Sequence, residues 1–323
     1  MVSVQLISLL EPIRPQIERV EGLVDEKLAA VEEPLQTMLR RSVGGGKHLR
    51  PALIILIGQM FAVPLEPFHR LAAAVDMLHA ATLIHDDLVD RSALRRGRET
   101  LHTIWPAGAT VLAGDYLLGQ ATLLIAELEH PPVCKVFADV LCTMCAGEIR
   151  RMLSAQDAPE RWQDYYRGIE AKTASLFAAS AEMAAILAGA EASQRTALCC
   201  FARELGIAFQ IVDDVLDLTG NEVLLGKPQG SDLRQGLLTL PILYYLESRA
   251  NPNPVSTVLA GQRDEAQVRA AIEAVCASEA IEAALQEASN HVRCGQEALA
   301  TLPDNESCRL LGSLAAYVVE RER

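Results

Sequence analysis

Two identical acidic motifs, each set in an apolar helical segment, restrict the possible folds of this chain more than any other feature. Both read DDxxD, and together they supply six carboxylates: Asp86, Asp87, Asp90, Asp213, Asp214 and Asp217. Because a helix turns by about 100° per residue, the first and last aspartates of each motif lie one turn apart on one face. Such pairs repel each other unless a cation lies between them, and oxygen ligands suit a hard divalent ion. One motif alone is as typical of an exposed helix end, whereas two identical motifs predict binding of Mg²⁺.

The second motif belongs to a longer polar stripe. Gln210 comes one turn before Asp213, so Gln210, Asp213, Asp214 and Asp217 share one face of a helix whose other positions are apolar. Mg²⁺ keeps several waters and is usually held by one or two carboxylates together with substrate phosphates. The two motifs therefore predict a phosphorylated ligand that the metal bridges to both helices.

The composition predicts helices throughout. The chain has 323 residues, of which 50% are hydrophobic and only 4% aromatic. Helical periodicity recurs over residues 12–40, 50–60, 65–90, 108–129, 132–155, 161–188, 193–218 and 240–248. The breaks between these segments are short, and no long linker precedes residues 251–254. We expect an all-α fold with a single domain over residues 1–323, in which residues 254–323 form peripheral C-terminal helices.

Charge, apolar segments and cysteines restrict the partners and the compartment. A net charge of −13 disfavours nucleic-acid binding. The N-terminus lacks a basic leader, and the apolar segments 52–58 and 183–190 are too short to cross a bilayer, so we expect neither a signal peptide nor a stable membrane anchor. The CxxC at residues 142–145 has no second pair or histidine nearby. We interpret the eight cysteines as buried free thiols of a cytoplasmic protein.

Several basic residues lie beside glycine-rich breaks or acidic motifs, where they could hold phosphates. A loop of three glycines leads into Lys47 and Arg50, which is typical of an anion cradle. Further candidates are Arg95 and Arg96 after the first motif, Lys172 with Thr173, Lys227, and His79 two turns before Asp86. Each one alone is more typical of a solvated surface, and their joint occurrence with the acidic motifs favours a phosphate-binding site. His85 beside Asp86 does not indicate a metal-dependent phosphohydrolase, because that chemistry needs further histidines.

These segments resemble the trans-isoprenyl diphosphate synthase family, also called polyprenyl synthetases. The resemblance covers nearly the full length and rests on GGKHLRP (45–51), MLHAATLIHDDLVD (77–90), RRG (95–97), AGDYLL (113–118), KTASL (172–176), FQIVDDVLD (209–217) and GKPQGSDLRQG (226–236). It implies a helical bundle of the isoprenoid-synthase type around a central cavity. It also implies three Mg²⁺ ions between the motifs, with Asp86, Asp90 and Asp213 among their ligands.

The resemblance further implies the substrates and the residues that hold them. The allylic diphosphate would contact Arg95, Lys172, Thr173, Gln210 and Lys227, and isopentenyl diphosphate would contact Lys47, Arg50, His79 and Arg96; Phe209 also counts among the substrate-binding residues. The allylic C–O bond would ionise, the double bond of isopentenyl diphosphate would attack the carbocation, and the released diphosphate would take the proton.

Two positions depart from the family pattern. Leu237 stands where a lysine is frequent, which removes one phosphate contact, and Arg151 stands where a glutamine is frequent. We expect activity to survive, because the other cations remain, with a weaker or rearranged grip on the allylic diphosphate.

The helix before the first motif predicts the length of the product. One turn advances about 5.4 Å, close to one prenyl unit, so residues one to three turns before Asp86 measure the depth of a product tunnel. In this family an aromatic residue four or five positions before the first aspartate stops growth early. This chain has Thr82 and Ala81 there, with Leu78 and Ala74 deeper. We therefore expect a product longer than C20, with geranylgeranyl or farnesyl diphosphate as the alternative.

Other classes remain as alternatives. A terpene cyclase or a squalene synthase-like enzyme shares the fold but lacks a cradle such as Lys47, Arg50 and Arg96. A non-catalytic partner subunit of a heteromeric synthase is expected to have lost one aspartate motif or its cations, and this chain keeps both. The resemblance implies a homodimer through the helix that contains Gly114, Asp115 and Tyr116.

Overall fold

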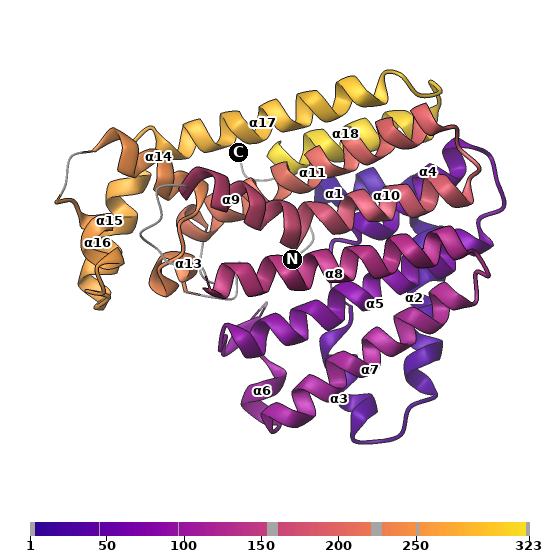
Figure 1. Ribbon diagram of the computed structural model, residues 1–323, viewed down its shortest axis with the longest axis horizontal. Coiled ribbons are helices and arrows are strands. Elements are labelled where there is room, and N and C mark those ends of the chain that lie inside the picture. Colours follow the sequence, from indigo (N-terminus) through magenta and orange to yellow (C-terminus); the bar gives the residue numbers. More distant parts are fainter. Residues whose placement is uncertain are drawn as a thin grey trace.

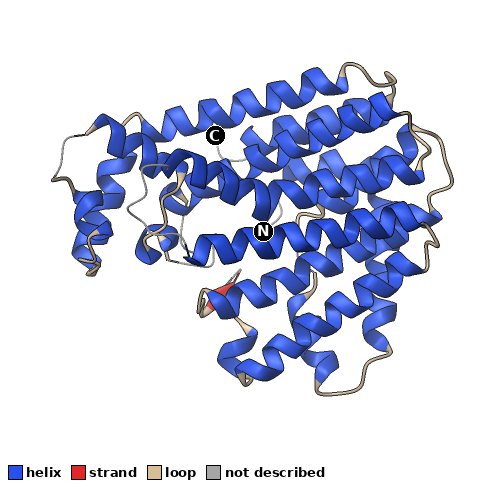
Figure 2. Cartoon of the chain, viewed as in Figure 1, coloured by secondary structure: helices blue, strands red, loops and turns tan. Residues whose placement is uncertain are grey.

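Helices make up nearly all of the computed structural model, which describes residues 4–44, 46–95, 97–153, 161–220, 228–249 and 252–320. The long helices run roughly side by side (Figure 1), and the strands in the described residues are one short antiparallel pair (Figure 2). The all-α prediction is confirmed.

The elements up to the middle of the chain are as follows: α1 (Val4–Leu10), η1 (Glu11–Ile13), α2 (Arg14–Ala29), α3 (Leu35–Ser42), α4 (Leu49–Met60), α5 (Glu66–Val89), β1 (Leu94–Arg95), β2 (Arg98–Glu99), α6 (Leu101–Ile104), α7 (Ala107–Ala126) and α8 (Pro131–Leu153). The remaining elements are α9 (Arg161–Ile169), η2 (Glu170–Ala174), α10 (Ser175–Leu187), α11 (Ala192–Thr219), α13 (Ser231–Gln235), α14 (Leu240–Ser248), α15 (Pro254–Leu259), α16 (Glu265–Cys276), α17 (Ala280–Leu299) and α18 (Glu306–Glu320).

The principal core lies between α4, α5, α10 and α11. α4 is apolar on every side and nearly all of its residues are buried, which is what a central helix requires. On α5 the consecutive alanines Ala72, Ala73 and Ala74 are fully buried, and such small side chains let neighbouring helices approach closely. The helices that carry the two aspartate motifs, α5 and α11, thus share one hydrophobic core.

A π-helical turn interrupts the helix that the sequence predicts over residues 161–188. This turn, η2, holds Lys172 and Thr173 and lies against α11. The contact requires a glycine, because a Cβ atom on Gly206 would lie 2.6 Å from Cα of Ala174. The predicted helix over residues 12–40 is likewise divided, into η1, α2 and α3.

The C-terminal helices belong to two different cores. α17 lies along α11 at the edge of the molecule (Figure 1), and its inner face adds Ala284, Ala288 and Val292 to the principal core. α14, α15 and α16 form a smaller core with α13, in which Val255 and Val268 are fully buried. Residues 254–323 were predicted to form peripheral helices, and α17, at the edge of the molecule, packs directly on the helix of the second aspartate motif.

Two expectations about surface chemistry need correction. All eight cysteines are free, but none is fully buried, and Cys142, Cys145, Cys200, Cys276 and Cys294 are exposed. Helical periodicity in the sequence does not show whether the face that carries a cysteine is buried.

One helix, α7, is long and apolar enough to span a membrane by length and composition, although we expected no such segment. In the structure α7 packs its inner side on α5 and leaves an apolar outer face.

Candidate active site

The first aspartate motif ends α5, and each of its carboxylates has a cation beside it. Nζ of Lys172 lies 3.0 Å from Oδ2 of Asp86, and Nε of Arg95 donates a hydrogen bond of 2.7 Å to Asp87. Burial raises the pKa of Asp86 and that of Asp87, while Lys172 and Arg95 work in the opposite direction. The helix thus presents carboxylates in a partly desolvated site, where positive charge binds more strongly than in water.

Two residues of α8 complete this part of the site; the sequence analysis named Arg151 only as a departure from the family pattern and gave Glu148 no role. Arg151 donates to Oδ1 of Asp90 over 3.0 Å, and it also pairs with Glu148. Glu148 lies 3.5 Å from Nζ of Lys172. Burial favours the neutral form of Glu148, but the hydrogen bond from Arg151 and the charge of Lys172 lower its pKa. The i, i+3 spacing of a glutamate and an arginine on one helix was the available signal.

The second motif is more deeply buried than the first. Asp214 is 4% exposed and accepts hydrogen bonds from the hydroxyl of Tyr165, at 2.8 Å, and from Gln210, at 2.9 Å. Burial raises the pKa of Asp214 well above its usual value, and the negative charge of Asp232 adds to this effect. Tyr165 lies on α9, far from Asp214 in sequence, so the sequence analysis missed it. Asp213 is more accessible, as a metal ligand must be.

Asp217 anchors the end of α11. Its side chain is 2% exposed and its Oδ2 atom accepts a hydrogen bond of 3.1 Å from the backbone N–H of Asp232. The backbone carbonyl of Asp217 accepts a hydrogen bond of 2.7 Å from Gly230. These bonds tie α11 to the segment that leads into α13.

The turn η2 connects the two motifs through consecutive residues. Lys172 pairs with Asp86 of the first motif. The hydroxyl of Thr173 donates a hydrogen bond of 2.7 Å to Gln210, which in turn donates to Asp214 of the second motif. The π-helical turn directs neighbouring side chains to different partners, so one short element positions groups from both acidic helices.

The two cations of the predicted anion cradle, Lys47 and Arg50, each lie over an aromatic ring. Nζ of Lys47 is 5.7 Å from the ring centre of Phe209, and the guanidinium of Arg50 is 4.3 Å from that of Phe177. Burial lowers the pKa of Arg50 to about 10, against the opposing charges of Asp76 and Asp213. Arg50 therefore stays charged at neutral pH, and its interaction with Asp213 connects the cradle to the second motif.

The roles of His79, Arg96 and Lys227 stay predictions. His79 is half-buried on α5, whereas Arg96 and Lys227 lie outside the described residues. His85 points to α7, with Nε2 3.1 Å from the carbonyl of Val111, and it contacts Gly114 where a Cβ atom would not fit. That contact places His85 between the two helices.

The four residues proposed to set product length lie on α5. Ala74 and Leu78 are fully buried, Ala81 is 2% exposed and Thr82 is half-buried. The hydroxyl of Thr82 bonds to the backbone carbonyl of His79. Their role in product length stays a prediction.

The donor set of the two motifs fits a hard divalent cation. Asp86, Asp90 and Asp213 offer oxygen atoms only, which suits Mg²⁺. Within the described part of the chain, no three His, Cys, Asp or Glu side chains converge closely enough to form a metal cage. An ion bound here would take its remaining ligands from water and from substrate phosphates, in the manner usual for Mg²⁺.

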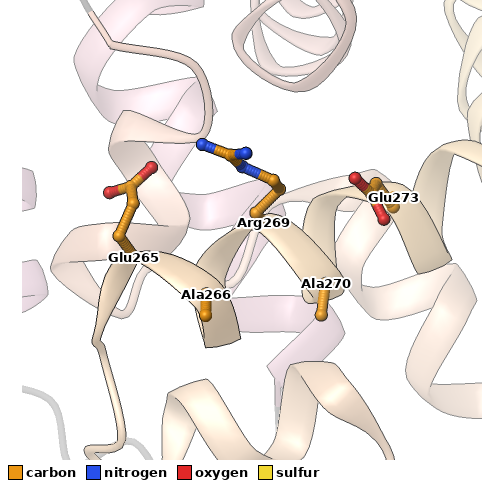
Figure 3. A pocket seen from close by; sticks show the side chains of 5 residues that line it. All are labelled: Glu265, Ala266, Arg269, Ala270 and Glu273. Carbon is orange, nitrogen blue, oxygen red and sulfur yellow. The ribbon is translucent and has the colours of Figure 1, made fainter.

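A shallow pocket on α16 does not belong to this site. It is lined by one face of that helix, by Glu265, Ala266, Arg269, Ala270 and Glu273 (Figure 3). Glu265 is paired there with Arg234 at 2.6 Å. The pocket contains neither an aspartate motif nor an aromatic wall, so the chemistry belongs to the site between α5 and α11.

Comparison with known proteins identifies the family. Residues 32–275 match the family model of polyprenyl synthetase. The chain is 34% identical to heptaprenyl diphosphate synthase component 2 of Geobacillus stearothermophilus, over 95% of this chain and 99% of that protein. It is 32% identical to octaprenyl diphosphate synthase of Haemophilus influenzae, over 94% of this chain and 97% of that protein.

A solved structure agrees with this result. The polyprenyl synthase of Caulobacter crescentus, in complex with calcium and isoprenyl diphosphate, superposes with a TM-score of 0.91 at 33% identity, covering 99% of this chain and 98% of that chain. The chain therefore belongs to the polyprenyl synthetase family and is a prenyl diphosphate synthase.

Proposed function

We propose that this enzyme condenses isopentenyl diphosphate head-to-tail with an allylic diphosphate and releases an all-trans polyprenyl diphosphate longer than C20. The observation that supports this most directly is the turn η2, whose Lys172 and Thr173 link the first and the second aspartate motif. A substrate that binds to both acidic helices at once needs a group that can reach both motifs, and a metal-bound diphosphate is such a group.

The residues of the chain divide into two binding roles. Lys172, Arg95, Thr173 and Gln210, with Lys227, hold the allylic diphosphate. Lys47, Arg50 and His79, with Arg96, hold isopentenyl diphosphate. Cations that face the leaving diphosphate stabilise the charge it acquires as the C–O bond ionises. The rings of Phe209 and Phe177 keep water away from the cation cradle.

Mg²⁺ is the metal we propose for Asp86, Asp90 and Asp213. When bound, it supplies positive charge to the departing diphosphate. A solved relative is in complex with calcium and isoprenyl diphosphate, which supports a divalent cation in this enzyme as well. We propose three ions in each active site, which the carboxylates of the two acidic helices and one diphosphate would hold together.

The length of the product follows from the wall of α5. Thr82, Ala81, Leu78 and Ala74 present no aromatic side chain that would close a tunnel beside this helix. Two relatives over nearly the whole chain are named as heptaprenyl and octaprenyl synthases, and this supports a long product.

Product analysis tests the proposal. The purified chain is incubated with Mg²⁺, labelled isopentenyl diphosphate and dimethylallyl, geranyl or farnesyl diphosphate, and the dephosphorylated products are sized by chromatography. Products longer than C20 are expected. A product that ends at C15 or C20 would show that a side chain on another helix closes the product tunnel. No incorporation with any primer would contradict the proposal and favour a subunit that needs a partner, as the name "component 2" of one relative suggests for that protein.

We also propose a cytoplasmic homodimer that forms through the outer face of α7. Val111, Leu112 and Leu123 are exposed on this face, with Leu112 67% exposed. Exposed apolar surface of this extent on one helix is typical of a protein interface. Gly114 faces α5 instead, so the interface uses neighbouring residues of the predicted helix. The eight free cysteines support a reducing compartment.

A further inference from the structure

Five charged side chains around the first aspartate motif alternate in sign. Asp86 pairs with Lys172 at 3.0 Å, Lys172 lies 3.5 Å from Glu148, Glu148 pairs with Arg151, and Arg151 lies 3.0 Å from Asp90. The row starts and ends on α5 and passes through η2 and α8. Both proposed metal ligands of the first motif are therefore already bound to a cation of the protein itself.

Arg151 is held at a position where two helices end. Asp90 is the C-terminal cap of α5, and Arg151 lies in the last turn of α8. The C-terminus of a helix carries partial negative charge, so a cation between two such ends is favoured. The side chains of Arg151 and Asp90 are only 27% and 23% exposed, and a pair so shielded from solvent is stronger than one on the surface.

Lys172 and Arg151, the two cations of the row, differ in the groups that they contact. Lys172 belongs to the turn that also reaches the second motif, and we have proposed that it contacts the diphosphate. Arg151 contacts Asp90 and Glu148. An ion that uses Asp90 as a ligand must share its carboxylate with this guanidinium or displace it.

We propose that Arg151 is a positioning residue that holds Asp90 in the metal-free enzyme and competes with the divalent cation for it. The competition weakens metal binding at the first motif until the substrate diphosphate brings further oxygen ligands. The metal then binds mainly together with the diphosphate, and the substrate-free site binds divalent cations only weakly. This inference rests on the proposed metal site.

Titration with Mn²⁺ tests the competition without relying on turnover. Free Mn²⁺ is followed by electron paramagnetic resonance with wild-type enzyme and with Arg151→Gln, first alone and then with inorganic diphosphate. Without diphosphate, R151Q is expected to bind Mn²⁺ about tenfold more tightly, the effect of removing a partly buried ion pair. A residue that only supports the fold would not make metal binding tighter when it is removed.

Two further variants make the result specific. Arg150→Gln removes the same charge one residue away, at an exposed position, and should leave Mn²⁺ affinity within about twofold of wild type. Arg151→Lys keeps the charge but loses the planar fork that reaches both Asp90 and Glu148, so its affinity should lie between those of wild type and R151Q. If R151Q does not fold, the Mn²⁺ affinity of R151K relative to that of wild type tests the competition.

The outcomes separate this inference from the proposed function. Equal or weaker Mn²⁺ binding by R151Q, or an equal gain in R150Q, would overturn the competition while leaving the metal site in place. If no variant binds Mn²⁺ even with diphosphate, the proposed metal site fails and the competition fails with it.

Discussion

At the scale of single residues, the three carboxylates of each motif are not equivalent. Asp87 is tied to Arg95, whereas Asp86 and Asp90 are held by cations that come from other helices. In the second motif, Asp214 is enclosed by Tyr165 and Gln210. A neutral hydroxyl and an amide leave that carboxylate poorly compensated, which is consistent with its raised pKa. Asp87, Asp214 and Asp217 are thus buried and held by groups of the protein, whereas Asp86, Asp90 and Asp213 are more accessible.

Lys172 is the residue whose loss should affect the reaction most among the described cations. Lys172→Gln removes the charge beside Asp86 and Glu148 and the proposed contact to the leaving diphosphate. We expect kcat/KM for the allylic substrate to fall about 100-fold, the usual effect of losing one group that stabilises developing charge. Steady-state kinetics with labelled isopentenyl diphosphate measures this.

The matched control for that variant is Lys135→Gln. Lys135 forms an exposed i, i+4 pair with Asp139 on α8, and exposed pairs contribute little. Its kinetics should equal those of wild type. A comparable loss of activity in both variants would show that Lys172 has no special role.

Glu204 gives a pH-dependent contribution to stability away from the substrates. It is 9% exposed and pairs with His291 and with Arg203. The hydrogen bond from His291 lowers its pKa below the usual 4.5, although burial opposes the shift. Because the folded pKa is the lower one, the stabilisation is complete above the unfolded pKa and is lost as the pH falls through the folded pKa.

Glu204→Gln should therefore lower the free energy of unfolding by about 2 kcal/mol at pH 7, and by less at pH 4. Thermal unfolding at both pH values checks this. Glu297→Gln, which removes an exposed pair with Arg293 on α17, should change stability little at either pH. A deficit in E204Q that is equal at pH 7 and pH 4 would contradict the linkage.

At the scale of elements, the close contact between α11 and η2 positions the site. Gly206→Ala should force these elements apart, because the new Cβ would lie 2.6 Å from a backbone atom of Ala174. We expect a loss of about 2 kcal/mol in unfolding free energy, typical of overpacking, and a raised KM for the allylic substrate as Lys172 and Thr173 shift.

The control for this prediction is Gly312→Ala on α18, where nothing lies within 4 Å of the added Cβ. That change should stabilise the protein by up to about 1 kcal/mol, because alanine is the better helix former. If G206A is as stable as wild type and keeps its KM, the contact does not position η2.

At the scale of the whole molecule, the outer face of α7 leaves several large apolar side chains exposed, namely Val111, Leu112 and Leu123. The helix passes a length and composition test for a membrane span, yet its inner side packs on α5. A second copy of the chain would cover the outer side without displacing that packing, and this is the reason we favour a dimer.

Leu112→Glu places a charge in the centre of this face and should convert the dimer to a monomer. Light scattering coupled to size-exclusion chromatography measures the mass. The control is Ile7→Glu on α1, which is also exposed, at 52%, and should leave the mass unchanged. A wild-type protein that elutes as a monomer, or an L112E protein that stays dimeric, would contradict the proposed interface.

The sequence by itself determined the helical class, the two acidic motifs and most of the cations, because these depend on spacing along one helix. Asp86 and Asp90, for example, share a face whatever surrounds them. Only the tertiary structure decided that Tyr165 hydrogen-bonds to Asp214 and that Arg151 lies against Asp90. It also decided that a π-helical turn links both motifs and that the cysteines are not buried. Such contacts join residues far apart in the chain, and their geometry depends on how closely whole helices pack, which local periodicity does not encode.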